Sequence, residues 1–243
     1  MMSKKKKLLI TGSTGLIGTA IAYKAAENNF SIALHYNRNI KKGQKIMNDL
    51  RKKNIECFLV QADLSKISGV KKLFKKIDNE WGRLDSVVNN ACLDFKRIPF
   101  VKINRKVIND MMNINFLACV DIMQESINRM IKQNLGSIVN ISTNAIKTGG
   151  NNISHYLASK SALETISFAV SKEVISNNIR INVVRPGIIK KKTENDKHSK
   201  EKANISPIDR FGLPEEVADT VIFLLSDKSS YISGEIISVS GGY

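Results

Sequence analysis

The sequence predicts an α/β fold, in which a doubly wound parallel sheet of about seven strands is covered by helices on both faces. Short apolar runs alternate with stretches of helical periodicity along the whole chain. Several runs are rich in Val and Ile and almost continuously apolar, as strands buried on both faces are. The 243 residues suit one domain with a large core, and no linker, repeat or low-complexity segment divides them. We therefore expect a single domain over residues 1–243.

Each expected strand is an apolar run bounded by turn or polar residues. The first is followed by Gly12, the second by Asn37, and the last by Ser240 and Gly241. In chain order the expected strands are Lys7–Thr11, Ser31–Tyr36, Glu56–Gln61, Ser86–Asn89, Ser137–Ile141, Arg180–Val184 and Ile236–Val239.

Between these strands, apolar residues recur at the spacing of a helix with one buried face. The first such stretch is rich in Ala, the best helix former, and the fourth is the longest. The expected helices cover residues 16–28, 40–53, 66–80, 104–133, 156–177 and 214–226. The segment Lys190–Asn204 is strongly polar, and we expect a mobile loop or short lid at about residues 189–212.

The net charge of +16 raises the question of nucleic-acid binding. The lysines are scattered over several expected helices and one loop, so they form no single basic element. We therefore expect no specific nucleic-acid partner, whereas attraction to an anionic substrate or an acidic carrier protein stays open. The lysine clusters are Lys4–Lys7, Lys41-Lys42, Lys52-Lys53, Lys71-Lys72, Lys75-Lys76 and Lys190–Lys192.

The sequence predicts a cytoplasmic protein with no membrane partner. No stretch approaches the roughly 20 apolar residues of a membrane span. The basic run Lys4–Lys7 is followed by only a short apolar segment, Leu8–Ile10, before Thr11 and Gly12. A secretory signal needs an apolar region of about 7 to 15 residues.

No metal site is expected. The cysteines and histidines lie far apart and match no metal-ligand spacing, and a sparse, odd number of cysteines suits a reduced compartment. These residues are Cys57, Cys92, Cys119, His35, His155 and His198.

A glycine-rich turn joins the first expected strand to the first helix. It reads Thr-Gly-Ser-Thr-Gly-Leu-Ile-Gly over residues 11–18. Glycines at such a turn let backbone N–H groups approach a pyrophosphate at the helix N-terminus, and Gly18 would let the helix pack closely on the strand. Because the turn directly follows the first strand of an alternating β/α chain, it indicates a Rossmann-like nucleotide site.

The end of the second strand indicates which dinucleotide is bound. In a dinucleotide-binding fold an acidic residue here holds the ribose 2′-hydroxyl, whereas an arginine accommodates a 2′-phosphate. The run His35-Tyr-Asn-Arg38 contains no acid and ends in an arginine. We therefore expect NADP(H), with NAD(H) as the poorer cofactor. The alternative for Arg38 is an ordinary solvated side chain.

Tyr156 and Lys160 are the strongest indication of chemistry. They lie four residues apart, so on a helix both side chains project from one face. An ammonium held beside a phenol lowers the phenol pKa, which suits a proton donor to a carbonyl. Such a pair is also common on solvated helix faces, and the surrounding motifs favour the catalytic interpretation.

Further motifs follow the expected strands in order, and with them the chain resembles the short-chain dehydrogenases/reductases. The resemblance covers nearly the whole chain. In layout the chain is similar to the 3-oxoacyl-acyl-carrier-protein reductases. Besides the glycine-rich turn and the Tyr-Lys pair, the residues that carry it are Asp63-Leu64, Asn89-Asn-Ala91, Ile114-Asn115-Phe116, Arg185-Pro-Gly187 and Gly241-Gly242.

The resemblance implies a role for each matching position. Tyr156 would be the catalytic acid/base, and Lys160 would bind the nicotinamide ribose. Asn115 would keep a water in the proton relay behind Lys160. Asn90 would support the cofactor and hold neighbouring strands together, and Asp63 would contact the adenine. The full set of expected cofactor contacts is Gly12, Ser13, Thr14, Gly15, Leu16, Ile17, Tyr36, Asn37, Arg38, Asp63, Leu64, Asn90, Ala91, Tyr156, Lys160, Pro186, Gly187 and Ile188.

One departure concerns the catalytic hydroxyl. The family's serine lies thirteen residues before the tyrosine, a position held here by Thr143, and Ser142 comes one residue earlier. Adjacent side chains on a strand point to opposite faces, so both hydroxyls cannot face a substrate without local distortion. The spacing from Asn115 also selects Thr143. We predict that Thr143 is the donor, with Ser142 as the alternative.

Two other departures lie in the cofactor motifs. The family turn has a glycine where this chain has Leu16, and this chain has Gly15 one position earlier. The run therefore matches the turn of the family's longer, sugar-nucleotide branch. The chain is too short for that branch's added substrate region. Cys92 replaces the glycine that usually closes the Asn-Asn-Ala-Gly run.

The predicted function is an NADPH-dependent ketoreductase that acts on a small-molecule carbonyl, with the expected lid over the substrate. A carrier-bound 3-oxoacyl thioester is one candidate substrate. The alternatives are a sugar or nucleotide-sugar dehydrogenase/reductase in surface-polysaccharide synthesis, and a non-catalytic cofactor-binding scaffold. Because members of the family are usually tetramers, we expect a homotetramer.

Overall fold

The computed structural model describes residues 5–94, 96–190 and 206–242. Their centre is a parallel sheet with the strand order β3-β2-β1-β4-β5-β6-β7. The predicted α/β class, parallel sheet and number of strands are confirmed. The strands are β1 (Lys7–Ile10), β2 (Ser31–Tyr36), β3 (Cys57–Gln61), β4 (Ser86–Asn89), β5 (Gly136–Ile141), β6 (Ile179–Pro186) and β7 (Ile236–Val239).

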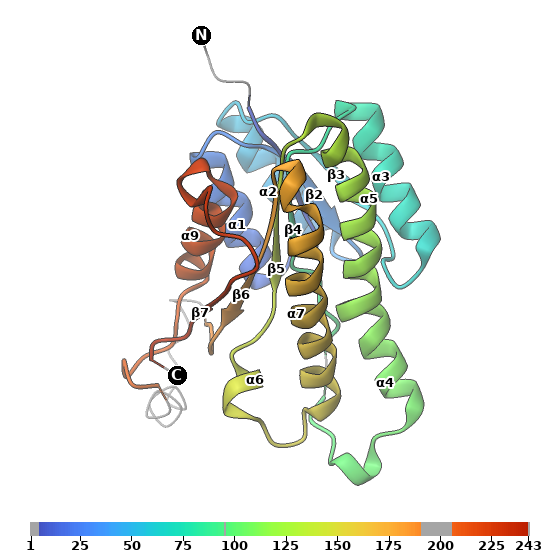
Figure 1. The fold of residues 1–243 in the computed structure, drawn as a ribbon, viewed down its shortest axis with the longest axis vertical. Helices are drawn as coiled ribbons and strands as arrows, with labels where there is room; N and C mark the ends of the chain where they lie inside the picture. The colour runs from blue at the N-terminus through green and yellow to red at the C-terminus, as the bar shows by residue number, and fades with distance from the viewer. Residues whose placement is uncertain (1–4, 95, 191–205, 243) are drawn as a thin grey trace.

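Helices cover both faces of the sheet (Figure 1). One layer contains α1 (Leu16–Glu27), α2 (Ile40–Lys52) and α9 (Pro214–Leu225), whose apolar faces share a buried cluster with one side of the sheet. The other layer contains α3 (Ile67–Trp81), α5 (Ala118–Gln133) and α7 (Ser154–Val174) over a second cluster. Burial on both faces explains why the central strands are almost continuously apolar.

The long helix expected over residues 104–133 is not uniform. It consists of α4 (Arg105–Met112), a π-helical segment η2 (Asn113–Leu117) and α5. A π segment widens one turn by a residue, so the apolar periodicity before and after it still reads as one helix. The segment brings Asn115 into the interior, where its side chain is fully buried. The short elements η1 (Phe100–Lys102), α6 (Ala145–Thr148) and η4 (Asp227–Ser229) were not expected, whereas η3 (Ile175–Asn177) forms the end of the helix expected over residues 156–177.

Most of the expected lid falls outside the described residues, since residues 191–205 are not among them. The described ends of the segment pair with each other. Lys190 N donates to Gly212 O at 3.0 Å, and Gly212 N donates to Ile188 O at 3.0 Å. A lid therefore stays a prediction.

The strand order reverses between β1 and β4, because β1 has β2 on one side and β4 on the other. In an open parallel sheet a crevice forms at such a point, outside the carboxyl ends of the strands. The glycine-rich turn, Asn90, Thr143 and Pro186 all lie at or just after the carboxyl ends of strands. The fold therefore gathers the predicted motifs at one edge of the sheet.

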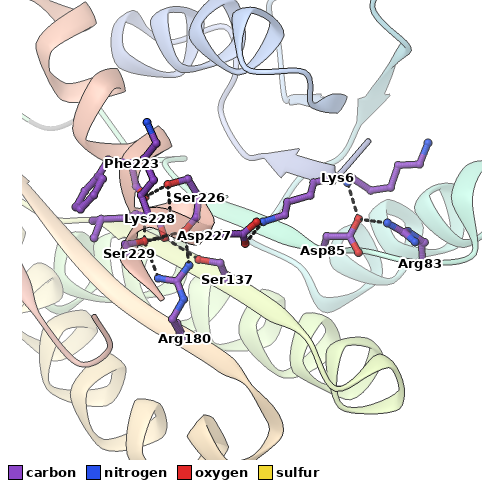
Figure 2. A network of polar contacts seen from close by, with 12 residues as sticks. Lys6, Arg83, Asp85, Ser137, Arg180, Phe223, Ser226, Asp227, Lys228 and Ser229 are labelled. Atoms are coloured by element: carbon purple, nitrogen blue, oxygen red, sulfur yellow. Dashed lines mark hydrogen bonds and ion pairs between the residues drawn. The ribbon is translucent and has the colours of Figure 1, made fainter. Parts of the chain in front are cut away.

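The opposite edge is held together by buried polar contacts (Figure 2). Arg180 on β6 is 9% exposed, and burial lowers its pKa. Its Nη1 donates to Ser229 Oγ at 3.0 Å and to Ile232 O at 3.3 Å, and its Nη2 donates to Ser226 O at 3.1 Å. One guanidinium thus fixes the segment between α9 and β7. Nearby, Asp227 pairs with Lys6 in the N-terminal segment.

We expect Arg180→Met to lower the free energy of unfolding by about 2–4 kcal/mol. The change removes three hydrogen bonds of the guanidinium, and each such bond contributes roughly 0.5–1.5 kcal/mol net. Ser226 O keeps Ser229 Oγ as a donor and Ile232 O keeps Asn182 Nδ2, so neither carbonyl is left unpaired. Urea unfolding would measure it. The matched control is Lys6→Ala, which breaks the solvent-exposed pair with Asp227 and should change stability by about 1 kcal/mol or less. Equal stability of Arg180→Met and the parent would contradict this role.

Candidate cofactor and catalytic site

An open cavity of about 690 Å³ lies at the carboxyl edge of the sheet. It brings together most of the residues predicted for the cofactor and the chemistry. They are Gly12, Thr14, Gly15, Leu16, Ile17, Asn37, Arg38, Leu64, Asn90, Ala91, Thr143, Tyr156, Lys160, Pro186 and Gly187. A smaller cavity of about 330 Å³ adjoins it at Gly187, and Ile188 lines this second cavity.

Besides Ile188, four predicted residues do not line the large cavity. Ser13, Tyr36 and Asn115 are buried, and the roles predicted for them stay predictions. Asp63 lies just beyond Ala62, and its Oδ1 accepts from Ser65 Oγ at 2.7 Å and Ser65 N at 3.1 Å. These bonds lower the pKa of the Asp63 carboxyl, which stays ionised at neutral pH.

The glycine-rich turn is packed too tightly for side chains at two of its positions. Gly12 has a left-handed φ of +62°, and a Cβ there would meet Ala91 Cα at 2.9 Å. At Gly18 a Cβ would meet Gly12 O at 2.4 Å. Helix α1 begins directly after Gly15, whose position carries no side-chain cap. The first amides of α1 are therefore available to an anion in the cavity.

Asn90 ties the end of β4 to the turn. Its Nδ2 donates to Thr11 O at 3.0 Å and to Gly12 O at 3.1 Å. In return, Thr11 Oγ1 accepts from Asn90 N at 2.9 Å and from Ala91 N at 3.0 Å. These bonds join β1 and β4 at the point where the strand order reverses.

Tyr156 and Lys160 lie one turn apart on α7 and both line the cavity. Burial raises the pKa of Tyr156, the neighbouring Cys92 adds to this, and a hydrogen bond with Thr143 opposes it. The expected lowering of this pKa by Lys160 is wrong, because burial is the largest influence on the phenol and raises its pKa. Lys160 Nζ, 2% exposed, donates to Ile141 O at 2.7 Å.

The two candidate hydroxyls point to different partners. Thr143 bonds to Tyr156 at the cavity. Ser142 Oγ, 4% exposed, donates to Glu164 Oε1 at 2.5 Å. Glu164 also accepts from Arg185 Nε at 2.7 Å, so Ser142 belongs to a buried ion-pair network. Both residues line the cavity, and of the two hydroxyls it is that of Thr143 that is hydrogen-bonded to the phenol.

Asn115 fastens the loop after β4 to α7. Its Oδ1 accepts from Leu93 N at 3.0 Å, and its Nδ2 donates to Ser159 Oγ at 3.1 Å. Ser159 in turn donates to Tyr156 O at 2.7 Å. Through Ser159, the residue before Lys160, Asn115 is therefore linked to the backbone of α7.

Sequence reasoning missed Glu164, Arg185 and His35 as parts of the site. Glu164 lies eight residues after Tyr156, so it continues the helix face of Tyr156 and Lys160, and that spacing was a usable signal. Cys92 lines the cavity, and desolvation raises the pKa of its thiol, so the group is a neutral thiol at neutral pH.

Within the described ranges, no group of three or more His, Cys, Asp or Glu side chains is arranged to hold a metal ion. Among the same residues, no helix is long and apolar enough to cross a membrane.

Comparisons with known proteins agree with this geometry. The family model described as Enoyl-(Acyl carrier protein) reductase matches residues 13–243. The 3-oxoacyl-[acyl-carrier-protein] reductase FabG of Staphylococcus aureus (strain Mu50 / ATCC 700699) is 29% identical over 99% of both chains. The uncharacterized oxidoreductase YgfF of Escherichia coli (strain K12) is 35% identical over 96% of this chain and 98% of its own length.

Solved structures show the same fold. YwfH, an NADPH-dependent reductase involved in bacilysin biosynthesis, has a TM-score of 0.92 and 27% identity over 98% of both chains. An NAD⁺-bound xylitol dehydrogenase has a TM-score of 0.91 and 24% identity over 100% of both chains, a likeness of fold alone. Together with the family match, these findings show that the chain belongs to the short-chain dehydrogenase/reductase family and is an NAD(P)-dependent oxidoreductase.

Proposed function

We propose that this enzyme is an NADPH-dependent ketoreductase. The observation that carries the proposal is the hydrogen-bonded pair of Thr143 and Tyr156 in a cavity that also holds the glycine-rich turn and Arg38. The uncapped first turn of α1 fits a pyrophosphate. Arg38, exposed at the end of β2, fits a 2′-phosphate. The bound cofactor supplies a hydride to the substrate carbonyl carbon.

The proton comes from the side chain of Tyr156, with Thr143 beside it. Thr143 donates a hydrogen bond to the substrate carbonyl oxygen and holds it beside Tyr156. As negative charge develops on that oxygen, the phenol of Tyr156 donates its proton and an alcohol forms. Burial raises the pKa of Tyr156, so the phenol holds its proton at neutral pH and has it to donate. Lys160, with Asn115 behind it, belongs to the path that returns the proton.

A 3-oxoacyl thioester is the proposed substrate. The support is the full-length similarity to a 3-oxoacyl-[acyl-carrier-protein] reductase and the net charge of +16, which suits an acidic carrier. The turnover of NADPH should be followed by absorbance with ketones, acetoacetyl thioesters and sugars. Fastest turnover of the thioester supports the proposal, and fastest turnover of a sugar would assign the enzyme to the sugar alternative. Binding of NADPH without turnover of any of them would identify a scaffold.

A homotetramer in the cytoplasm is the proposed working form. Helices α4, α5 and α7 belong to one helical layer (Figure 1). Each exposes a large apolar side chain, namely Ile108, Ile131 and Phe168 at 41%, 43% and 50%. Association would remove this apolar surface from water. Light scattering coupled to size-exclusion chromatography would give the mass, and a monomer would exclude the tetramer.

We expect NADPH to be preferred to NADH by at least tenfold in kcat/KM, or about 1.4 kcal/mol. Arg38 makes charge-assisted bonds to a 2′-phosphate, and no carboxylate at this strand end repels it. Arg38→Ala should remove most of the preference and barely change the rate with NADH. Steady-state kinetics with both cofactors would measure this.

The matched change in the other direction is Asn37→Asp. Asn37 is exposed and lines the cavity, whereas the neighbouring Tyr36 is buried and would not tolerate a carboxylate. An aspartate at position 37 should move the preference toward NADH by offering an acceptor to the ribose hydroxyl. If the parent uses both cofactors equally well and Arg38→Ala leaves both rates unchanged, Arg38 is an ordinary solvated side chain with no role in cofactor choice.

A further inference from the structure

We propose that His35 is a positioning residue for the dinucleotide, one that holds the glycine-rich turn and the loop after β3 in the arrangement that cofactor binding requires. This inference rests on the proposed function and adds a residue to it. His35 lies on β2, is 2% exposed and borders the large cavity, yet no step of the proposed chemistry uses it.

Both ring nitrogens of His35 are hydrogen-bonded. Its Nδ1 accepts from Gly12 N at 3.0 Å, and its Nε2 lies 3.1 Å from Ala62 O. A carbonyl oxygen only accepts, so Nε2 carries the hydrogen, and Nδ1 must be bare to accept from an amide. The partners therefore fix one neutral tautomer. Burial agrees with this assignment, since it lowers the pKa of His35 to about 4.

The backbone of His35 adds two bonds to the same turn. Its carbonyl oxygen accepts from Ser13 N at 2.9 Å and from Ser13 Oγ at 3.0 Å. Side chain and backbone together thus hold Gly12 and Ser13, the residues that enter the turn with a left-handed conformation at Gly12. An unheld amide at this point would leave the turn free to move away from a pyrophosphate.

The second partner connects the turn to the proposed adenine contacts. Ala62 directly precedes Asp63 and Leu64, and Leu64 lines the cavity. One imidazole therefore spans the gap between two loops that grip different parts of the same dinucleotide. Loss of either bond should weaken binding of the adenine and pyrophosphate half, while the reaction centre at Tyr156 is left unchanged.

Three substitutions separate the two bonds. His35→Asn places a carbonyl oxygen near the position of Nδ1, and so keeps an acceptor for Gly12. His35→Gln can extend its amide toward Ala62 in place of Nε2. His35→Leu removes both bonds. The matched control is Ile32→Val on the same strand, a core change that costs about 0.5–1.5 kcal/mol of stability and touches neither loop.

Binding of NADPH and of 2′-phospho-ADP-ribose should be titrated by calorimetry, with kcat measured at saturating NADPH. For His35→Leu we expect the Kd of both ligands to rise roughly tenfold, with kcat within about twofold of the parent. His35→Asn should recover much of the affinity by holding Gly12. Ile32→Val should bind both ligands as the parent does, even though it is less stable.

The outcomes separate this inference from the proposed function. Parent-like affinity in His35→Leu, or in His35→Gln where the leucine variant does not fold, would overturn the positioning role alone. A loss in kcat equal to the loss in affinity, without recovery in His35→Asn, would show a general structural role and also overturn it. Failure of the parent itself to bind NADPH or NADH would overturn the proposed function, and this inference with it.

Discussion

Tyr156→Phe should lower kcat for carbonyl reduction by roughly 10³-fold, the middle of the range for loss of a general acid. The phenyl ring keeps the packing of the half-buried tyrosine on α7 but has no proton to transfer. The Kd for NADPH should stay within a few-fold of the parent value, because the phenol contributes less to binding than to chemistry. Steady-state rates and a separate binding titration would measure the two effects.

Lys160→Ala provides the contrasting variant. Lys160 Nζ is bound to Ile141 O at the edge of the cavity, where the proposed nicotinamide ribose lies. Removing it should weaken both turnover and cofactor binding, whereas the tyrosine variant should lose turnover alone. A substantial residual rate in Tyr156→Phe would mean that the proton comes from another group.

The sheet and the cofactor turn were predictable because their signals are local. An apolar run that stops at a glycine-rich turn, as at Gly12, marks a buried parallel strand and the start of a helix whatever the rest of the chain does. The position of Asn115 was predictable only from family resemblance. Its π-helical setting was not, since one extra residue in a turn hardly alters a helical period.

Contacts between distant segments were beyond the sequence. The four-residue spacing of Tyr156 and Lys160 predicted a lowered phenol pKa, but nothing in it shows that the ammonium bonds to Ile141 or that burial raises that pKa. For His35, the sequence indicated only that no metal-ligand spacing includes it. Its two partners, Gly12 and Ala62, become neighbours only when three parallel strands align.

The choice between Ser142 and Thr143 joins the two kinds of reasoning. Spacing selected Thr143, and the partners of the two hydroxyls support that choice, since Thr143 bonds to Tyr156 and Ser142 to Glu164. Thr143→Ala should therefore lower kcat by roughly 10²-fold or more, the scale of losing one oxyanion donor. Ser142→Ala should stay within about threefold of the parent, because Glu164 keeps its ion pair with Arg185.

Thr143→Ser completes the comparison, because it restores a hydroxyl to the cavity without the methyl group and should recover most of the activity. The measurement is kcat for all three variants at saturating NADPH, with thermal unfolding to show that each is folded. The reverse ranking, with Ser142→Ala inactive and Thr143→Ala active, would mean that the chain turns differently after β5 and presents the other face to the substrate. In that case the catalytic hydroxyl would be that of Ser142, which is hydrogen-bonded to Glu164, the partner of Arg185.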